Sequence, residues 1–577
     1  MLRTLLIAPL LALVTACTTN GGFIMPDEAL RRAQADARLK SEARAYSQFA
    51  IARYASLTDD PESAAENYAR VALTAPNDST VAERAVFSSL LVGNVNTAAG
   101  LAKRIPTNTL NTTELPRLAL AVDALANGKT DKALGYLNQP WTSAFHAALA
   151  RSIAAWIMVE DAPDAAIRLQ ASAGDTDPVL SGVSQTLAAL MKLSTGDTGG
   201  AQADLDNLWA AHARLAIGVE ANARLMALSG HPEAALARVK DFRDNVGRNP
   251  SLSALVNEIN DGTVTAPKPL SAKQGTALAI YAATAALSGQ NDSDLPSVYF
   301  ALAMHLDPKL EAARTLWADT LDTAGRRPEA IALLRAVPTD SIYHTSAQGQ
   351  LAWALRREER NDEALILAQQ TLERTSDRNI RIQLADLLQS LERDGEAEAA
   401  LTDVINADTK EGTYDWRIYF ARGAARERLG RWPPAENDLK TALGLKPDSA
   451  TIMNYLGYGW IDRGVRLDDG LRLIENALRL APNSGAITDS LGWAHYKLGN
   501  YDRAVFYLER ATEITPQGAD ILDHLGDAYW QTGRYTEAGY QWQRALRYSN
   551  DAEESDLIQK KLSGGFALLT AASSTTP

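Results

Sequence analysis

The chain has 577 residues, more than one compact hydrophobic core normally holds, which predicts several domains or one long repeat array. Hydrophobic residues make up 46% and charged residues 22%, a composition typical of folded chains that argues against wholesale disorder. The formal net charge of −13 gives no general attraction to polyanions, so we expect no nucleic acid among the partners.

The N-terminus has the pattern of an export signal. Arg3 precedes an apolar run over residues 5–14, which is only half of the roughly 20 residues that a membrane-spanning helix needs. The single cysteine of the chain, Cys17, follows directly and excludes both an intramolecular disulfide framework and a cysteine zinc cluster. Residues 14–17 (VTAC) resemble the lipobox of bacterial lipoproteins.

This resemblance implies cleavage before Cys17 and acylation of its thiol. Residues 1–16 are then a lipoprotein signal peptide, and residues 17–30 are the acylated cysteine and a short tether. Two or three acyl chains hold a protein on a membrane, whereas one chain binds marginally. Thr18 implies export to the outer membrane. In familiar Gram-negative lipoproteins, an Asp directly after the acylated cysteine marks those that are not exported there. The alternative is an ordinary secretory signal followed by a chance cysteine.

The rest of the chain shows an internal repeat. Gly423, Gly457, Gly492 and Gly526 follow one another at spacings of 34, 35 and 34 residues, the last three within Leu-Gly pairs. Further small residues, such as Ala504, recur where two antiparallel helices need to approach closely. The spacing and these small residues resemble the tetratricopeptide repeat (TPR), a helix pair with a period of 34 residues.

The expected fold is all-α: a TPR-type α-solenoid, a right-handed superhelix of antiparallel helix pairs, with about 12–14 units. Two prolines and a glycine near residues 262–270 stop any helix, which predicts two solenoid segments joined there. We therefore expect a degenerate N-terminal solenoid, a linker or kink, a C-terminal solenoid, and a terminal helix with a frayed tail. Their ranges are 31–261, 262–276, 277–552 and 553–577.

The sequence contains no recognisable catalytic motif. A phosphate-binding GxxxxGK[ST] loop, an HExxH pair and a GxSxG nucleophile elbow are all missing from it. The seven histidines are scattered, and none lies four residues from another, so a helical metal-binding pair is missing too. We therefore expect a protein that is not an enzyme and that has no metal or cofactor.

In TPR proteins, the first helix of each unit lines the concave face of the superhelix, mainly through its positions 2, 5, 9, 12 and 13. Carried over to the C-terminal units, these and adjoining positions form an aromatic and acidic stripe. The candidate partner-binding residues are Asn454, Tyr458, Asp489, Trp493, Tyr496, Asp523, Asp527 and Trp530.

The stripe has two interpretations. In the first, the aromatic rings bind apolar side chains of a partner, and the carboxylates favour its basic or N-terminal groups. In the second, the aromatic rings pack between neighbouring helices. Both roles stay open for Trp493 and Tyr458, whereas packing is favoured for Tyr496 and Trp530.

The C-terminal repeats resemble the corresponding part of a family of large proteobacterial TPR lipoproteins. The resemblance rests on residues 454–458 (NYLGY), 473–478 (LIENAL), 489–493 (DSLGW) and 523–530 (DHLGDAYW). One group of that family is the outer-membrane adaptor of a periplasmic carboxyl-terminal processing protease, to which it presents cell-wall hydrolases. The resemblance implies a lipid-anchored scaffold of the envelope that faces the periplasm. The alternative is a structural subunit of an outer-membrane export, secretion or pilus-assembly machine.

Overall fold

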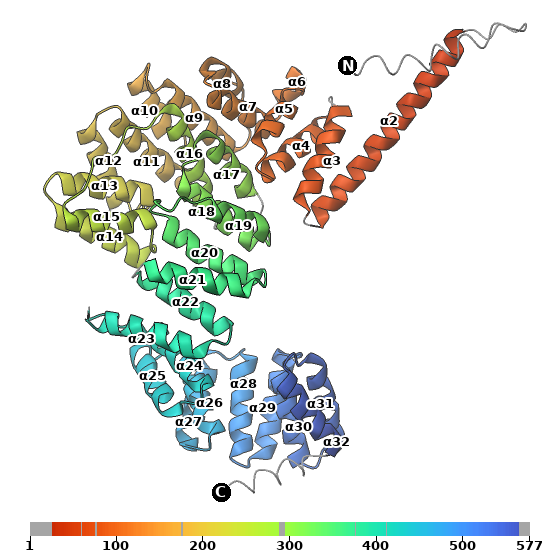
Figure 1. The fold of residues 1–577 in the computed structure, drawn as a ribbon, viewed down its shortest axis with the longest axis vertical. Coiled ribbons are helices and arrows are strands. Elements are labelled where there is room, and N and C mark those ends of the chain that lie inside the picture. Colours follow the sequence, from red (N-terminus) through yellow and green to blue (C-terminus); the bar gives the residue numbers. More distant parts are fainter. Residues whose placement is uncertain are drawn as a thin grey trace, which may run out of the picture. The chain divides into compact units, whose positions relative to one another are not determined.

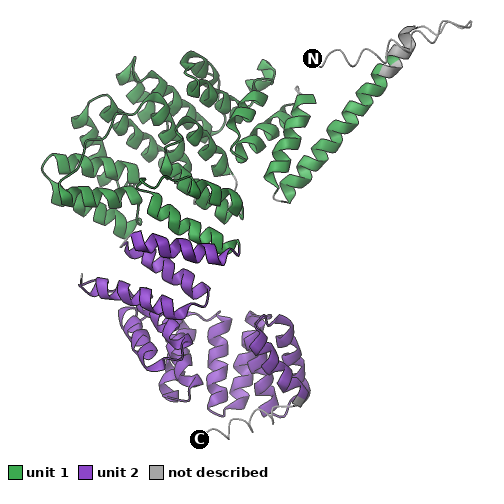
Figure 2. Cartoon of the chain, viewed as in Figure 1, with its two compact units in different colours: residues 1–358 green, residues 359–577 purple. Residues whose placement is uncertain are grey.

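The computed structural model describes residues 26–564, except 59, 75–77, 175–176, 288–294, 375–376 and 411 (Figure 1). This part consists of 31 helices and contains no strand, which confirms the all-α prediction. None of these helices is long and apolar enough to cross a membrane. The predicted signal peptide and Cys17 lie outside the described residues. The chain divides into two compact units, residues 1–358 and 359–577 (Figure 2).

The helices of unit 1 are α2 (Pro26–Leu57), α3 (Pro61–Thr74), α4 (Ser79–Leu91), α5 (Val95–Ala102), α6 (Thr107–Leu110), α7 (Glu114–Ala126), α8 (Thr130–Leu137), α9 (Ala144–Met158), α10 (Pro163–Ala171), α11 (Pro178–Ser194), α12 (Thr198–Ala210), α13 (Ala216–Leu228), α14 (Pro232–Asn245), α15 (Pro250–Asp261), α16 (Ala272–Leu287), α17 (Leu295–Leu306), α18 (Glu311–Thr323), α19 (Arg327–Arg335) and α20 (His344–Arg357). Because α2 begins at Pro26, the last part of the expected tether is helical.

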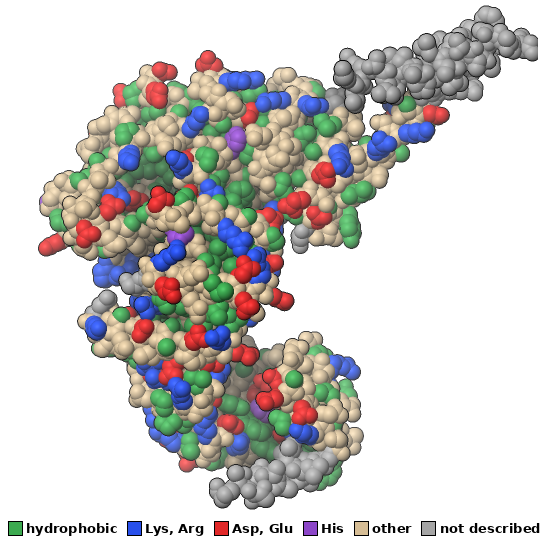
Figure 3. Space-filling model, viewed as in Figure 1, with side chains coloured by type: hydrophobic (Ala, Val, Ile, Leu, Met, Phe, Trp, Pro, Cys, Tyr) green, Lys and Arg blue, Asp and Glu red, His purple; other side chains and the backbone are tan. Residues whose placement is uncertain are grey.

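The helices of unit 2 are α21 (Asn361–Arg374), α22 (Arg378–Ser390), α23 (Asp394–Lys410), α24 (Trp416–Arg428), α25 (Trp432–Leu445), α26 (Ala450–Asp462), α27 (Leu467–Leu480), α28 (Gly485–Lys497), α29 (Tyr501–Ile514), α30 (Ala519–Gln531), α31 (Tyr535–Tyr548) and α32 (Ala552–Gly564). On the face drawn in Figure 3, acidic and basic side chains are interspersed, so the net charge of −13 is not gathered into one patch there.

The helices form the pairs that the repeat predicts. In α28 and α29, for example, Ser484 accepts a hydrogen bond from Ile487 N and so caps the first helix. Gly499 turns the chain with φ 75°, a conformation that favours glycine. A Cβ built on Gly492 would lie 2.6 Å from Leu508 Cγ, so the crossing of the two helices has no room for a side chain.

The segment expected to join two solenoids lies inside unit 1, and the boundary between the units is at residues 358 and 359 instead. Gly262 ends α15 in the left-handed conformation, and residues 263–271 run without helix. They bring α16 against α9 and α11, and α17 against α4 and α7 (Figure 1). The physical reason is visible in α17, where residues 298–303 are all buried: a helix that is apolar all round needs neighbours on every side.

Polar contacts and a close helix crossing hold the segment that starts at residue 263 and continues through α16–α19, which we call the returning segment, against α7, α9 and α11. Lys273 Nζ donates to the Ala126 carbonyl at 2.7 Å, and Leu270 N donates to Ser194 Oγ at 3.1 Å. A Cβ built on Gly275 of α16 would overlap the indole of Trp156 on α9, which is fully buried. Because Gly275 and Trp156 are more than a hundred residues apart, no local sequence pattern predicts this contact.

We expect Gly275→Ala to destabilise unit 1 by roughly 1–3 kcal/mol, because the added methyl group overpacks the crossing with Trp156. The matched control is Gly135→Ala in α8, where the new methyl group meets open space and raises helix propensity by roughly 0.5–1 kcal/mol. Urea unfolding followed by circular dichroism checks both. Equal unfolding midpoints for the two variants would contradict the packing of α16 on α9.

Candidate functional site

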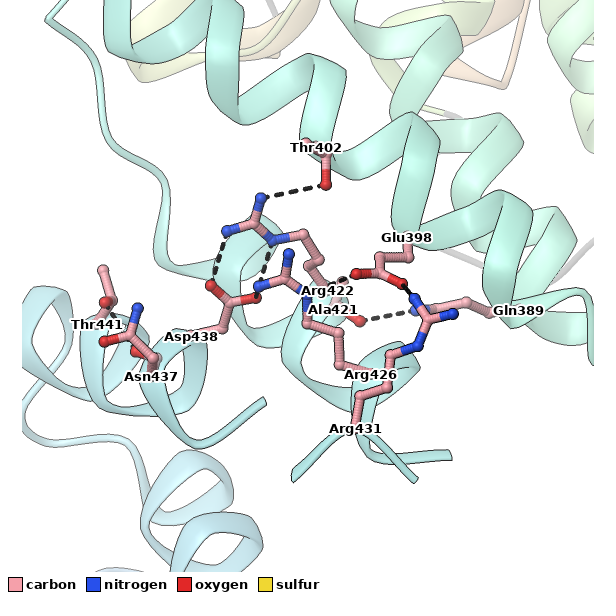
Figure 4. A network of polar contacts seen from close by, with 10 residues as sticks. All are labelled: Gln389, Glu398, Thr402, Ala421, Arg422, Arg426, Arg431, Asn437, Asp438 and Thr441. Carbon is pink, nitrogen blue, oxygen red and sulfur yellow. Dashed lines mark hydrogen bonds and ion pairs between the residues drawn. The ribbon is translucent and has the colours of Figure 1, made fainter. Parts of the chain in front are cut away.

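The candidate residues lie on three neighbouring first helices of unit 2, α26, α28 and α30, which contact one another in turn. The preceding pair, α24 and α25, packs beside α26 and is braced by a charge network (Figure 4). Arg422 donates to both carboxylate oxygens of Asp438 at 2.8 and 2.7 Å. Arg426 joins Asp438 to Glu398 on α23 at 2.8 Å each. This bidentate network fixes α24 against α25 and α23.

Trp493 is stacked between two other rings. Its indole lies parallel to the Tyr496 ring, with centroids 4.7 Å apart, and its other neighbour is the His524 ring at 4.1 Å. Its Nε1 is buried without a hydrogen-bond partner among the described residues. Two rings of the protein therefore stack on the indole of Trp493, which is half-buried, and these contacts favour a role in packing.

His524 forms an ion pair with Asp489, at 2.9 Å between Nδ1 and Oδ1. Burial by itself lowers the pKa of His524, but the carboxylates of Asp489, Asp523 and Asp527 outweigh it and raise this pKa to about 9. The imidazole is therefore a cation at neutral pH, and it compensates the buried carboxylate of Asp489.

Asp523 and Asp527 belong to an internal ion-pair cluster. Lys561 of α32 contacts Asp523 Oδ2 at 2.6 Å and Asp527 at 2.8 Å, and its side chain is only 9% exposed. Trp542 Nε1 also donates to Asp527 Oδ1 at 3.0 Å. The two carboxylates therefore already have a cation, supplied by the protein's own last helix, instead of an open approach for a basic partner.

Trp530 and Tyr496 both pack against the core of the last helix pair. The Trp530 ring lies 4.6 Å from Tyr535 and 5.6 Å from Trp542. The Tyr496 hydroxyl accepts a hydrogen bond from Gln531 Nε2 at 3.4 Å. These contacts agree with the role in packing that the sequence favours for both residues.

The side chains of Tyr458 and Asn454 have fewer polar contacts inside the protein than those of the candidate residues Asp489, Asp523 and Asp527. Tyr458 is half-buried, and its hydroxyl has no hydrogen-bond partner within the described ranges; Asn454 Oδ1 is buried and also unpaired there. Burial and the nearby carboxylates, of which Asp462 and Asp520 are exposed, raise the pKa of Tyr458. We call Asn454, Tyr458, Asp462 and Asp520 the Tyr458 patch.

The sequence interpretation overlooked Lys561 and His524. Lys561 follows Asp527 by 34 residues, and Asp527 follows Trp493 by the same number, so all three occupy one repeat position. Extending the period by one more unit identifies α32 as the first helix of an incomplete repeat. The pairing of His524 with Asp489 spans 35 residues and had no comparable local signal.

Comparison with known proteins locates the repeats. The tetratricopeptide-repeat family model TPR_16 matches residues 462–519 and 490–553, so this part of the chain carries TPRs. A TPR repeat-containing protein of Pseudomonas aeruginosa is 33% identical over 104 residues, which span 18% of this chain and 18% of that relative's length. TPR proteins are generally non-catalytic scaffolds for other proteins, and the match indicates no enzyme family.

Solved structures with similar helical repeats include a chain of an APC/C hetero-tetramer, at 15% identity over 90% of this chain and 96% of that one, with a TM-score of 0.38. A TPR protein of Parabacteroides merdae is 16% identical over 44% and 97%, with a TM-score of 0.38. PilW, a type IV pilus biogenesis factor, is 22% identical over 35% and 90%, with a TM-score of 0.29.

Stability should fall as His524 loses its proton. Its pKa in the folded protein, about 9, lies above the unfolded value of 6.5, so the stabilisation is complete below about pH 6.5 and is lost as pH rises through about 9. We expect a loss of roughly 2–3 kcal/mol in the free energy of unfolding between about pH 6.5 and 10. Urea unfolding checks this, and Asp489→Asn should flatten the same pH range. An equal slope in both proteins would contradict the assigned ion pair.

Removal of Lys561 should expose the cost of the buried carboxylates. We expect Lys561→Met to lower the free energy of unfolding by roughly 3–5 kcal/mol at neutral pH, since it leaves Asp523 and Asp527 without their cation. Burial and Asp523 already raise the pKa of Asp527, so the loss should shrink as pH falls and the carboxyl group takes up its proton. Lys560→Met, at an exposed i,i+4 pair with Asp556, is the matched control and should change stability by less than about 0.5 kcal/mol.

Proposed function

We propose that the protein is a lipid-anchored TPR scaffold of the bacterial cell envelope, held on the outer membrane through Cys17 and facing the periplasm. In this role it binds and assembles other envelope proteins through the concave surface of unit 2. As an adaptor, it presents substrates such as cell-wall hydrolases to a periplasmic protease. The lipobox-like residues 14–17 support the anchor, and the TPRs over residues 462–553 support the scaffold.

The Tyr458 patch is the observation that carries the protein-binding part of this proposal. Asp489, Asp523 and Asp527 have cations inside the protein, whereas Asp520 has no ion-pair partner in the described part of the chain. Beside it, the hydroxyl of the half-buried Tyr458 has no hydrogen-bond partner there, and Asn454 Oδ1 is buried without one. The exposed carboxylate of Asp520 and the unpaired hydroxyl of Tyr458, beside a half-buried ring, suit a lysine, an arginine or an N-terminal ammonium group of a partner.

The proposed contact has the composition of an interface hot spot. A tyrosine ring contributes apolar area at low entropic cost, and the unpaired polar groups around it supply specificity. The lipid anchor adds a second effect: it confines the scaffold to one membrane surface, which raises the effective concentration of partners assembled on it.

Site-specific photo-crosslinking in intact cells tests the proposal. The crosslinker belongs at Asp520, which is exposed, because two rings of the protein already stack on the half-buried Trp493 indole. We expect it to capture a soluble periplasmic peptidase or cell-wall hydrolase, and Tyr458→Ala to reduce this adduct at least tenfold. The matched control places the crosslinker at Glu513, an exposed residue on the second helix α29, where we expect no such adduct.

Other outcomes would overturn parts of the proposal. Capture of a channel or secretion subunit at Asp520 would replace the adaptor by a structural component of an export machine. No adduct from a folded, membrane-bound protein would exclude the Tyr458 patch as the binding surface. Cys17→Ser should move the protein from the membrane to the soluble fraction, and unchanged membrane association would exclude the lipid anchor.

A further inference from the structure

Unit 1 contains a cavity of about 600 Å³ that the scaffold role does not use. Its walls come from the end of α2, from α3 and α4, from the starts of α7 and α9, and from the turn between α18 and α19. The returning segment α16–α19 therefore contributes one wall, through Ala324 and Arg326. The volume lies within the range of roughly 300–1,000 Å³ that small-molecule sites occupy.

Several charged residues of the cavity already have partners in the protein. Asp60 accepts a hydrogen bond from Ser63 N at 3.0 Å and caps α3. Arg326 is largely buried and donates to the Leu91 carbonyl at 3.3 Å and to Glu329 at 2.9 Å. These side chains hold the walls together and are not available to orient a ligand.

Glu114 is likewise occupied. It pairs with His146 Nδ1 at 2.7 Å, and it accepts hydrogen bonds from Thr142 and from Ser143 N. Burial raises its pKa, but these hydrogen bonds outweigh that effect and lower the pKa to about 2. His146 Nε2 lies 2.7 Å from the hydroxyl of Tyr299 on α17, which fixes the ring. Glu114 is therefore a permanent, structurally engaged anion in this wall.

Two adjacent charged residues of α4 that line the cavity, Glu83 and Arg84, are available to a ligand. The half-buried guanidinium of Arg84 makes a single hydrogen bond, to the Tyr68 hydroxyl at 3.3 Å, and has no ion-pair partner in the described part of the chain. Glu83, which is exposed, has neither a hydrogen bond nor an ion pair there. Desolvation of its carboxyl group by surrounding atoms and the charge of Glu114 raise the pKa of Glu83, although the residue as a whole is exposed. Val81, Ala82, Ala85 and Val86 are buried, so α4 presents this charged pair from a rigid position.

The charge pattern selects the class of ligand. An inorganic dianion would be attracted by Arg84 but repelled by the carboxylates of Glu83 and Glu114. A simple cation would be attracted by these carboxylates but repelled by Arg84 and Arg326. A ligand with both charges satisfies Arg84 through a carboxylate, which fits the guanidinium fork, and Glu83 through an ammonium group. The remaining walls include Phe87, Leu91 and Leu115, which suit an apolar body.

We propose that this cavity binds a small zwitterion with an apolar side chain, either a free α-amino acid or a short peptide with both termini free. The carboxylate lies on Arg84, the ammonium group lies near Glu83, and the apolar side chain packs on Phe87 and Leu115. This site is independent of the concave surface of unit 2, so the two proposals fail separately.

Isothermal titration calorimetry on the full-length protein tests the site with four probes: leucine, dileucine, N-acetyl-leucine and leucinamide. We expect leucine or dileucine to bind, and their comparison distinguishes a free amino acid from a peptide. N-acetyl-leucine lacks the ammonium group and leucinamide lacks the carboxylate, so each should bind at least tenfold more weakly than leucine.

Variants assign each end of the ligand. Glu83→Gln should abolish the preference for leucine over N-acetyl-leucine, because the partner of the ammonium group is lost. Arg84→Gln should abolish the preference for leucine over leucinamide, because the partner of the carboxylate is lost. Arg104→Gln, an exposed arginine on the loop after α5, is the matched control and should leave all four affinities unchanged. Arg84→Lys keeps the charge but not the guanidinium fork, so it should weaken leucine binding even if Arg84→Gln fails to fold. Absence of binding by all four probes at millimolar concentration, or equal binding of leucine and both blocked probes, would overturn the proposal.

Discussion

The close approach of paired helices at positions without a side chain is the constraint on which the structure depends. At Gly457, a Cβ would lie 2.9 Å from the Gly470 carbonyl oxygen of the partner helix, and at Gly423 it would lie 3.1 Å from Leu439 Cγ. Such crossings set the distance between the two helices of each pair and the spacing of about 34 residues between pairs. That spacing in turn decides which side chains of successive first helices share one surface.

The shared surface of α26, α28 and α30 brings acidic side chains together, and their burial requires cations. His524 compensates Asp489, and Lys561 compensates Asp523 and Asp527. The terminal helix α32 thus closes the solenoid in two ways. It packs on the last helix pair, and its Lys561 supplies the positive charge that the carboxylates of α30 need. In the Tyr458 patch, Asp462 pairs with Lys497 at 3.5 Å, whereas the Asp520 carboxylate and the Tyr458 hydroxyl have no partner in the described part of the chain, and the proposed binding surface rests on these two groups.

Unit 1 uses the same kind of helix pair differently. There the chain returns on itself, and α16 and α17 cover the first helices α4, α7, α9 and α11. The helices of a solenoid normally offer such a face to partners, but here it is filled by an apolar pair from the same chain. The return also completes the wall of a cavity beside α4. The two proposed sites therefore lie in different units, the protein-binding surface in unit 2 and the small-molecule cavity in unit 1.

The sequence by itself determined the all-α fold, the helix pairs and the period of the C-terminal repeats, because Gly and Ala at fixed spacing record a local packing requirement. Tertiary structure alone decided that residues 263–271 return the chain onto α9 and α11. The reason is that contacts such as Gly275 with Trp156 join residues far apart in the chain, and periodicity carries information only about neighbouring units.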